Sequence, residues 1–179
     1  MTFNEKKFDE LLLYVAELSS DDPTFGKTKL NKVLYYADFY AYGLFGEPIT
    51  GATYQRRTFG PVPREISAAR SRLVSRQAVR FEEWSYFGRP QQRIVALRKP
   101  DLSVFTTAEL ALVGEVTEML LKLNGSEVSA KSHGEVGWLL AQDGETIPYE
   151  SVFLNPVELT AEDIRRGLEI EAELIRDAA

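Results

Sequence analysis

Apolar residues recur at helical spacing for about five turns after Lys27, a pattern that predicts the longest helix in the N-terminal half of the chain. Gly43 and Gly46 follow as stop signals. A helix with one apolar face needs other elements to cover that face, so this helix is expected to be packed in the core. Gly26 and Lys27 are interpreted as its start. The repeating positions are Leu30, Val33, Leu34, Ala37, Ala41 and Leu44.

This helix begins with the letters GKT, which resemble the end of a phosphate-binding loop. A Walker-type loop reads GxxxxGK[ST], because several backbone N–H groups must curl around a phosphate. Here Asp21 stands where the opening glycine belongs, and Asp22 adds a second negative charge. Pro23 removes one N–H donor, and the segment before it is helical rather than strand-like. The sequence therefore argues against a nucleotide site.

The remaining patterns predict one mostly helical α+β domain over residues 1–179, with about six helices around a small antiparallel sheet of about three strands. A strand is expected where the apolar period changes to two, over 52–59. The segments AVRFEEWSYF and QQRIVALR are expected to pair as a hairpin across GRPQ, with a bulge between Phe81 and Trp84. Longer helices are expected over 4–19, 27–44, 63–75, 106–123 and 160–178. The segment NGSEV is expected to end one helix and start another, and VGWLL is expected to form a short helix.

Two capping boxes mark helix starts in the C-terminal half. Thr106 with Glu109 forms the first, and Ser132 with Glu135 forms the second, just before VGWLL. The second box would open a short helix that covers the core with Val136, Leu139 and Leu140.

The chain contains no cysteine, which excludes disulfides, thiolate metal sites and cysteine nucleophiles. Its N-terminus lacks an apolar signal region, and no run approaches the roughly 18 apolar residues of a membrane helix. We therefore expect a soluble cytoplasmic protein that does not bind membranes. No pattern indicates a metal site or a cofactor.

Charge is divided along the chain, although the net charge is -6. Residues 101–179 hold sixteen acids against five bases. Residues 54–80 hold seven arginines against one acid, Glu65, and this segment can dock either an acidic protein surface or nucleic acid. The arginines on the expected helix do not share one narrow face and the whole chain is acidic, so protein is favoured. The arginines are Arg56, Arg57, Arg64, Arg70, Arg72, Arg76 and Arg80.

His133 is the only histidine in the chain, and no nucleophile motif accompanies it. It is expected in the first turn of a helix, between the capping Ser132 and Glu135, which favours a structural or binding role over catalysis. An enzymatic function would require a pocket where His133 meets carboxylates of perturbed pKa.

Three segments in order, KLNKVLYYADFYAYG, EPITGATYQRRTFGPVP and SHGEVGWLLA, resemble the Panacea domain of the SocA-like type II antitoxins. The resemblance covers residues 28–140, so the helices expected over 4–19 and 160–178 lie outside it as additions. The chain departs from the family where Gly137 stands before the tryptophan, since the family tends to have proline there. The motif positions are Lys29, Leu30, Lys32, Tyr36, Ala37, Asp38, Pro48, Ile49, Tyr54, Gly60, Pro61, Val62, His133 and Trp138.

The resemblance implies a mostly helical, non-enzymatic antitoxin of a toxin–antitoxin system. Such a protein binds and neutralises a toxin that is usually encoded beside it, in settings that include phage defence. One similar family member is a proteolytic adaptor that delivers its toxin to the ClpXP protease. The expected partners are therefore a cognate protein toxin and a ClpXP-type protease, with a nucleic-acid-binding regulator that uses residues 56–80 as the alternative.

The motif residues are divided by their chemistry. Aromatic and arginine side chains dominate binding hot spots, so the candidate partner contacts are Lys32, Tyr36, Tyr54, Arg56, Arg57 and Phe59. Reversing the charges of Arg56 and Arg57 is expected to weaken partner binding without harming the fold. Tyr36 and its neighbour Tyr40 could instead lie under the N-terminal helix. The positions expected to maintain the fold are Leu30, Asp38, Ile49, Gly60, Pro61, Val62, His133 and Trp138.

Overall fold

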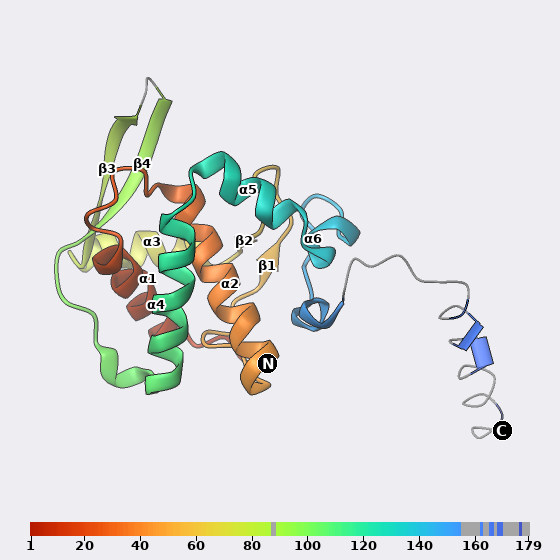
Figure 1. The fold of residues 1–179 in the computed structure, drawn as a ribbon. Helices are drawn as coiled ribbons and strands as arrows, with labels where there is room; N and C mark the ends of the chain where they lie inside the picture. Colours follow the sequence, from red (N-terminus) through yellow and green to blue (C-terminus); the bar gives the residue numbers. More distant parts are fainter. Residues whose placement is uncertain (87–88, 155–161, 163–164, 167, 170–175, 177–179) are drawn as a thin grey trace.

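The computed structural model describes the chain except residues 87–88, 155–161, 163–164, 167, 170–175 and 177–179 (Figure 1). Most of the helix expected over 160–178 lies outside the described residues. Within them, the mostly helical α+β class is confirmed. The helices are α1 (Glu5–Leu18), α2 (Lys27–Phe45), α3 (Ile66–Ser75), α4 (Thr107–Leu121), α5 (Gly125–His133) and α6 (Val136–Leu140), with short 3-10 helices η1 (Leu102–Val104) and η2 (Tyr149–Phe153).

Helix α2 runs through the centre of the domain, in contact with α1, α4, α5 and η2 (Figure 1). It begins at Lys27 with Gly26 as its N-cap and ends before Gly46, whose left-handed φ of 80° suits a glycine. Val33, Leu34 and Ala37 have no exposed surface. The predicted packed helix and its start are therefore confirmed.

Helix α1 contributes its apolar face and two buried acids to the same core. Phe8 and Leu11 have no exposed surface. Asp9 accepts two hydrogen bonds from Arg72 of α3, at 2.6 and 2.8 Å. Glu10 pairs with Arg98 at 2.6 Å. Burial by itself raises the pKa of Glu10, but the hydrogen bonds from Arg98 and from the Asp101 backbone outweigh it and lower that pKa.

The strands form two separate two-stranded antiparallel sheets, where the sequence suggested one small sheet. In the first, β1 (Tyr54–Gln55) pairs with β2 (Val62–Pro63), so the strand expected over 52–59 is shorter. In the second, β3 (Val79–Tyr86) pairs with β4 (Arg89–Ala96) as the predicted hairpin.

The bulge expected in the β3–β4 hairpin is absent, because the register runs without interruption from the pair Val79–Ala96 to the pair Tyr86–Arg89. Phe81 lies against Arg70 of α3, whereas Trp84 is 47% exposed and contacts Arg93. The bulge was expected because the alternation of apolar residues breaks between Phe81 and Trp84. The two side chains are three residues apart, so they lie on opposite faces of a regular hairpin and no bulge is needed.

Two helix starts differ from expectation. Helix α3 begins at Ile66 rather than at Pro63, because Pro63 pairs with Tyr54 in the first sheet. The Ser132–Glu135 capping box is wrong: Ser132 lies inside α5 and donates a hydrogen bond to the Ser129 carbonyl at 2.9 Å. The capping box of Thr106 with Glu109 is confirmed, and Asn124 with Glu127 forms another at the start of α5.

Helix α6 does not cover the core in the way that its apolar residues suggested. Leu139 is 52% exposed and Leu140 is 72% exposed, while Val136 is only half-buried. The expectation that all three face the core is therefore wrong. None of the helices in the described part of the chain combines the length and the apolar character required to span a membrane.

Candidate functional site

Asp38 is the polar centre of the core around α2, with no exposed surface. Its carboxylate accepts hydrogen bonds from the Thr50 backbone N–H at 2.7 Å and from the Thr50 hydroxyl at 2.5 Å. The Tyr54 hydroxyl lies 2.8 Å from the same carboxylate. Burial raises the pKa of Asp38 to about 6, against the opposing effect of the hydrogen bonds from Thr50 and Tyr54. The structure thus places Asp38 and Tyr54 where they join α2 to β1.

Tyr36 lies beneath the region where α5 leads into α6, with no exposed surface. Its hydroxyl donates to Glu135 at 3.1 Å, and the Lys131 ammonium lies 5.4 Å from its ring centroid. Burial raises the pKa of Tyr36 well above its usual range, and the negative charge of Glu135 adds to this effect. Tyr40 packs against Tyr36 with ring centroids 5.3 Å apart. The cover of Tyr36 therefore comes from the α5–α6 region.

Trp138 of α6 links that helix to the β1–β2 loop. The Arg56 guanidinium lies 3.9 Å from the centroid of the Trp138 ring, and His133 stacks on the same side chain at 4.1 Å. Arg56 also donates to the backbone carbonyls of Trp138 at 3.1 Å and Ala141 at 2.5 Å. The Trp138 indole N–H donates to the Arg57 carbonyl at 3.3 Å. The loop and α6 consequently form one unit.

His133 is the last residue of α5 (Gly125–His133) and does not stand in a first helical turn as expected. Burial lowers its pKa, and the positive charges of Lys32 and Arg56 lower it further. Its Nε2 atom is buried and has no hydrogen-bond partner in the described part of the chain. The imidazole is therefore neutral at pH 7, packed on Trp138.

The β1–β2 loop closes over Lys32 of α2, which is only 1% exposed. Gly60 makes this approach possible, because an added Cβ would lie 2.5 Å from Lys32 Cε and 2.4 Å from Ser132 Oγ. Its φ of +99° also favours glycine. The Lys32 ammonium donates to the Pro61 carbonyl at 3.4 Å and forms no ion pair among the described residues. Burial alone lowers the pKa of Lys32 to about 7.

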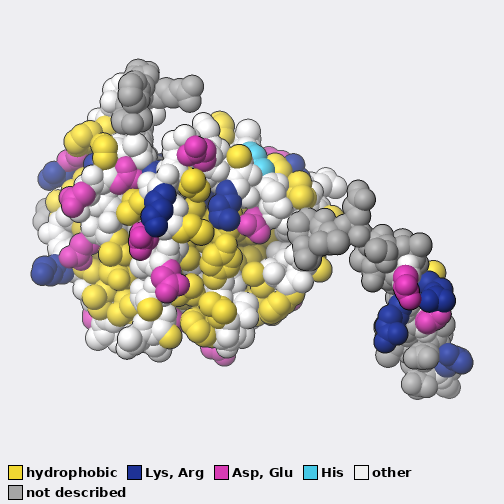
Figure 2. Space-filling view, in the orientation of Figure 1, with side chains coloured by type: hydrophobic (Ala, Val, Ile, Leu, Met, Phe, Trp, Pro, Cys, Tyr) yellow, Lys and Arg dark blue, Asp and Glu magenta, His cyan; other side chains and the backbone are white. Residues whose placement is uncertain are grey.

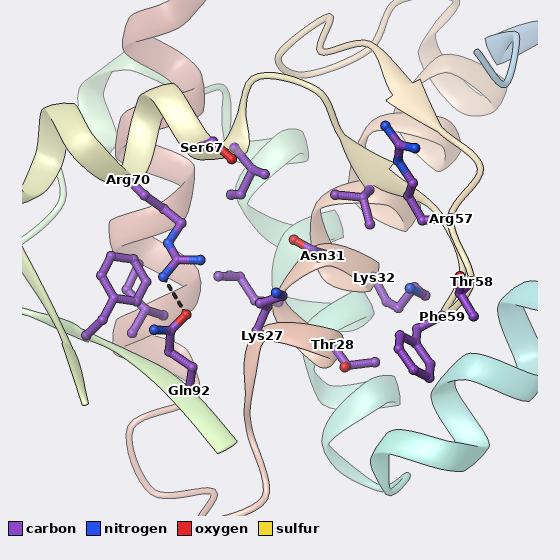
Figure 3. A pocket seen from close by; sticks show the side chains of 15 residues that line it. Lys27, Thr28, Asn31, Lys32, Arg57, Thr58, Phe59, Ser67, Arg70 and Gln92 are labelled. Carbon is purple, nitrogen blue, oxygen red and sulfur yellow. Dashed lines mark hydrogen bonds between the residues drawn. The ribbon is translucent and has the colours of Figure 1, made fainter. Parts of the chain in front are cut away.

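A pocket of about 340 Å³ lies between α2, α3, the β1–β2 loop and the β3–β4 hairpin (Figure 3). Figure 3 shows Arg70 and Gln92 on one side and Lys32, Arg57 and Phe59 on the other, with the first turns of α2 between them. Its lining residues are Lys27, Thr28, Leu30, Asn31, Lys32, Arg57, Thr58, Phe59, Val62, Ile66, Ser67, Arg70, Phe81, Gln92 and Ile94.

The six predicted contact residues separate by exposure. Arg57 is exposed, and Phe59 is 70% exposed. Arg56 is half-buried and bonded to α6. The other three do not face solvent as a partner contact in this conformation would require, because each has at most 1% of its surface exposed: Lys32, Tyr36 and Tyr54.

The positions expected to maintain the fold also differ in burial. Val62, His133 and Trp138 are half-buried, with Val62 lining the pocket. The buried ones are Leu30, Asp38, Ile49, Gly60 and Pro61.

Sequence reasoning named Arg70 only as one of seven arginines and missed other polar residues of the pocket, among them Asn31 and Gln92. The burial of Asn31 could have been predicted, because it lies three positions before Leu34 and therefore on the apolar face of α2. A polar side chain in that phase is buried, and Asn31 is 4% exposed. Arg70 and Gln92 come from separate elements and meet only in the folded chain, where Arg70 donates to Gln92.

The arginine-rich segment does not form a single basic surface. Arg72 pairs with Asp9, and Arg80 pairs with Glu82 at 2.7 Å. Arg70 lies over the Phe81 ring at 4.0 Å. On the face that Figure 2 shows, basic and acidic side chains are interspersed with hydrophobic surface between them. The paired arginines Arg72 and Arg80 therefore do not contribute to a continuous row of free basic side chains, which contact with a nucleic-acid backbone would require.

The described residues contain no group of three or more His, Asp or Glu side chains that could hold a metal ion. The pocket presents cations, amides and hydroxyls, which bind and orient a ligand. Its lining includes no carboxylate and no histidine. The chemistry that the arrangement supports is therefore recognition of a negatively charged or acceptor group.

Fold and site together define a small, mostly helical α+β binding domain with a cationic pocket. A family model described as the Panacea domain of SocA-like antitoxins matches residues 30–139. The chain belongs to this family, and the membership suggests an antitoxin role and a non-catalytic regulatory protein. The comparison with curated proteins finds no match, and neither does the comparison with solved structures.

Proposed function

We propose that this protein is a cytoplasmic antitoxin that neutralises a co-encoded protein toxin by direct binding. The family match over residues 30–139 carries the proposal. The structure supports a binding role, because the exposed end of the β1–β2 loop joins the exposed apolar residues of α6 through the contacts of Arg56 and Trp138.

The proposed contact surface consists of Arg57 and Phe59 on the loop and Leu139 and Leu140 on α6, which we call the loop–α6 surface. All four side chains are exposed. Among the described residues, the Arg57 side chain bonds to Gln55 at 2.9 Å and makes a long contact of 3.8 Å with Asp143. An exposed arginine next to an exposed phenylalanine, with exposed leucines on α6, has the composition of a binding hot spot in an apolar surround.

Co-expression with the product of the adjacent reading frame tests the function. If that product stops growth, this chain should restore growth and should co-purify with the toxin at a fixed ratio. The paired variant Arg57→Glu with Phe59→Ser should lose both rescue and co-purification. A control, Arg64→Glu, reverses another exposed charge outside the loop–α6 surface and should retain both. Rescue by the paired variant would contradict the proposed surface.

The route of neutralisation is tested in cells with and without ClpXP. Occlusion predicts that rescue persists without the protease and that the toxin accumulates in a complex. An adaptor role predicts that rescue requires the protease and that the toxin disappears when this chain is present. We favour occlusion, since it needs only the loop–α6 surface.

A further inference from the structure

The pocket beside α2 has a strongly one-sided charge. Four basic side chains line it, from α2, the β1–β2 loop and α3, and no acidic side chain does. Basic side chains around one concavity give it a positive potential, and this potential favours the entry of an anion. The four are Lys27, Lys32, Arg57 and Arg70.

Two polar groups in the pocket wall are buried without adequate partners. The Asn31 Oδ1 atom is buried and accepts no hydrogen bond from any described residue. Lys32 is 1% exposed and has a single long hydrogen bond, to the Pro61 carbonyl. Unsatisfied buried polar groups are costly and rare in native structures, so two of them in the wall of one pocket point to a group that completes them there.

The first turn of α2 adds donors to the same wall. Lys27 and Thr28 line the pocket, and the helix N-cap is Gly26, which supplies no side-chain acceptor. The first N–H groups of a helix have no intrahelical partner, and the helix dipole favours negative charge there. These donors reinforce the attraction that the buried groups of Asn31 and Lys32 create.

Apolar side chains complete the pocket. Val62 and Ile66 line it together with Phe59 and Phe81. A volume of about 340 Å³ lies at the lower end of the range for small-molecule sites. An ion alone would leave this apolar surface uncovered, whereas a compact organic body would cover it.

From this arrangement we infer that the pocket binds a small organic oxyanion, a carboxylate or phosphate group carried on a compact apolar body. The oxyanion contacts the exposed Lys27 and is attracted by the buried Lys32 behind it in the α2 wall. A hydroxyl or amino group of the ligand donates to Asn31 Oδ1, and the apolar body lies against Phe59, Val62 and Ile66. This site is separate from the loop–α6 surface except at Arg57 and Phe59, and it does not require a toxin.

Isothermal titration of the full chain with phenyl phosphate, benzoate, inorganic phosphate and benzyl alcohol tests the inference. Phenyl phosphate or benzoate should bind more tightly than both inorganic phosphate, which lacks the apolar body, and benzyl alcohol, which lacks the charge. The side-chain amide resonances of Asn31 should shift on binding, which places the probe in the pocket.

Lys32→Met and Lys27→Met should each weaken binding of the aromatic anion by more than about tenfold. Lys27 is exposed, so its replacement tests the pocket without changing a buried position. The control Lys122→Met removes an exposed lysine on the surface of α4 and should bind as the wild type does.

Three results would overturn the inference. The first is the absence of binding by both aromatic anions at millimolar concentration. The second is binding that neither lysine variant weakens. The third is binding of an acidic peptide, acetyl-Gly-Phe-Glu-Gly-amide, where neither aromatic anion binds, since that would assign the pocket to a partner protein's side chain. Loss of toxin rescue leaves these measurements unaffected, so the two proposals fail separately.

Discussion

Lys29 and Lys32 lie three residues apart on α2 and are equally buried, but among the described residues only Lys29 has a counter-ion. The Lys29 ammonium lies 2.8 Å from Asp22 and 2.7 Å from the Thr24 hydroxyl. Within the same part of the chain, Lys32 has only a long hydrogen bond of 3.4 Å to the Pro61 carbonyl. Both side chains are 1% exposed. A buried pair compensates part of its desolvation cost, whereas an unpaired buried ammonium does not, so the two lysines have opposite effects on stability.

Replacing each lysine by methionine should separate these effects. Lys32→Met removes an unpaired buried amine at similar volume and should raise the free energy of unfolding by about 1–3 kcal/mol. Lys29→Met leaves Asp22 without its cation and should lower the free energy of unfolding by about 3 kcal/mol or more. Urea unfolding at pH 7 measures both. Equal destabilisation by the two variants would show that Lys32 is paired in the folded protein.

The stability advantage of Lys32→Met should shrink as the pH rises from 7 to 9. In the unfolded chain Lys32 has its ordinary pKa of 10.5, and burial lowers the folded-state pKa to about 7. Between these values the unfolded chain binds more protons, so the wild type gains stability with pH, by about 2 kcal/mol over this range relative to the variant. His133, whose pKa is lowered, stays neutral throughout. Parallel pH profiles for the two proteins would contradict the assignment.

Tyr54→Phe should lower the free energy of unfolding by about 2 kcal/mol. The Tyr54 hydroxyl lies 2.8 Å from Asp38 and 2.7 Å from the Leu34 carbonyl, so its removal leaves buried acceptors with fewer donors. Tyr42→Phe is the matched control, because the Tyr42 hydroxyl makes an exposed bond of 3.3 Å to Glu150. The control should change stability by less than about 0.5 kcal/mol. Chemical unfolding of both variants measures these changes, and equal effects of the two substitutions would contradict the prediction.

Gly60→Ala should destabilise the fold by more than about 2 kcal/mol. The new methyl group would meet Ser132 and Lys32 within 2.5 Å in a left-handed backbone conformation. Gly125→Ala offers a control at the start of α5, where an added Cβ meets nothing within 4 Å. That control should be neutral or slightly stabilising. Thermal unfolding of the two variants gives the comparison, and a wild-type melting temperature for Gly60→Ala would refute the close contact.

Charge reversal at Arg56 and at Arg57 should have different consequences, a prediction that replaces the earlier expectation that both leave the fold intact. Arg56→Glu loses hydrogen bonds to α6 carbonyls and the contact with Trp138, and should lower stability by about 2 kcal/mol or more. Arg57→Glu should leave the melting temperature within about 2 °C of the wild type and should weaken toxin binding. Calorimetry with a pull-down on the same samples distinguishes the two outcomes.

The elements with a strong local signal could be predicted from the sequence. Helix α2 has a regular apolar period, and the box of Thr106 with Glu109 fixes the start of α4. The Ser132–Glu135 pattern misled because Ser132 has the same spacing to Glu135 but lies inside α5, where its hydroxyl bonds to Ser129. Short motifs do not reveal whether the preceding residues are already helical.

The candidate site depends on contacts between distant segments, so it was less accessible to sequence reasoning. The aromatic and cationic character of Lys32, Tyr36 and Tyr54 suggested partner contacts, but their burial depends on the loop after β1 and on α5. The pocket joins Asn31 to Arg70 and Gln92, which no local pattern connects. Arg57 and Phe59, at an exposed loop end, keep their predicted role as proposed contacts.

The ion pairs of α1 have a practical consequence for any attempt to isolate the part of the chain that matches the family. A fragment of residues 30–139 would omit Asp9 and Glu10, the carboxylates that hold Arg72 and Arg98. It would also expose the surface that Phe8 and Leu11 cover. Expression clones designed on family boundaries alone should therefore yield insoluble material, and useful clones must retain the first helix.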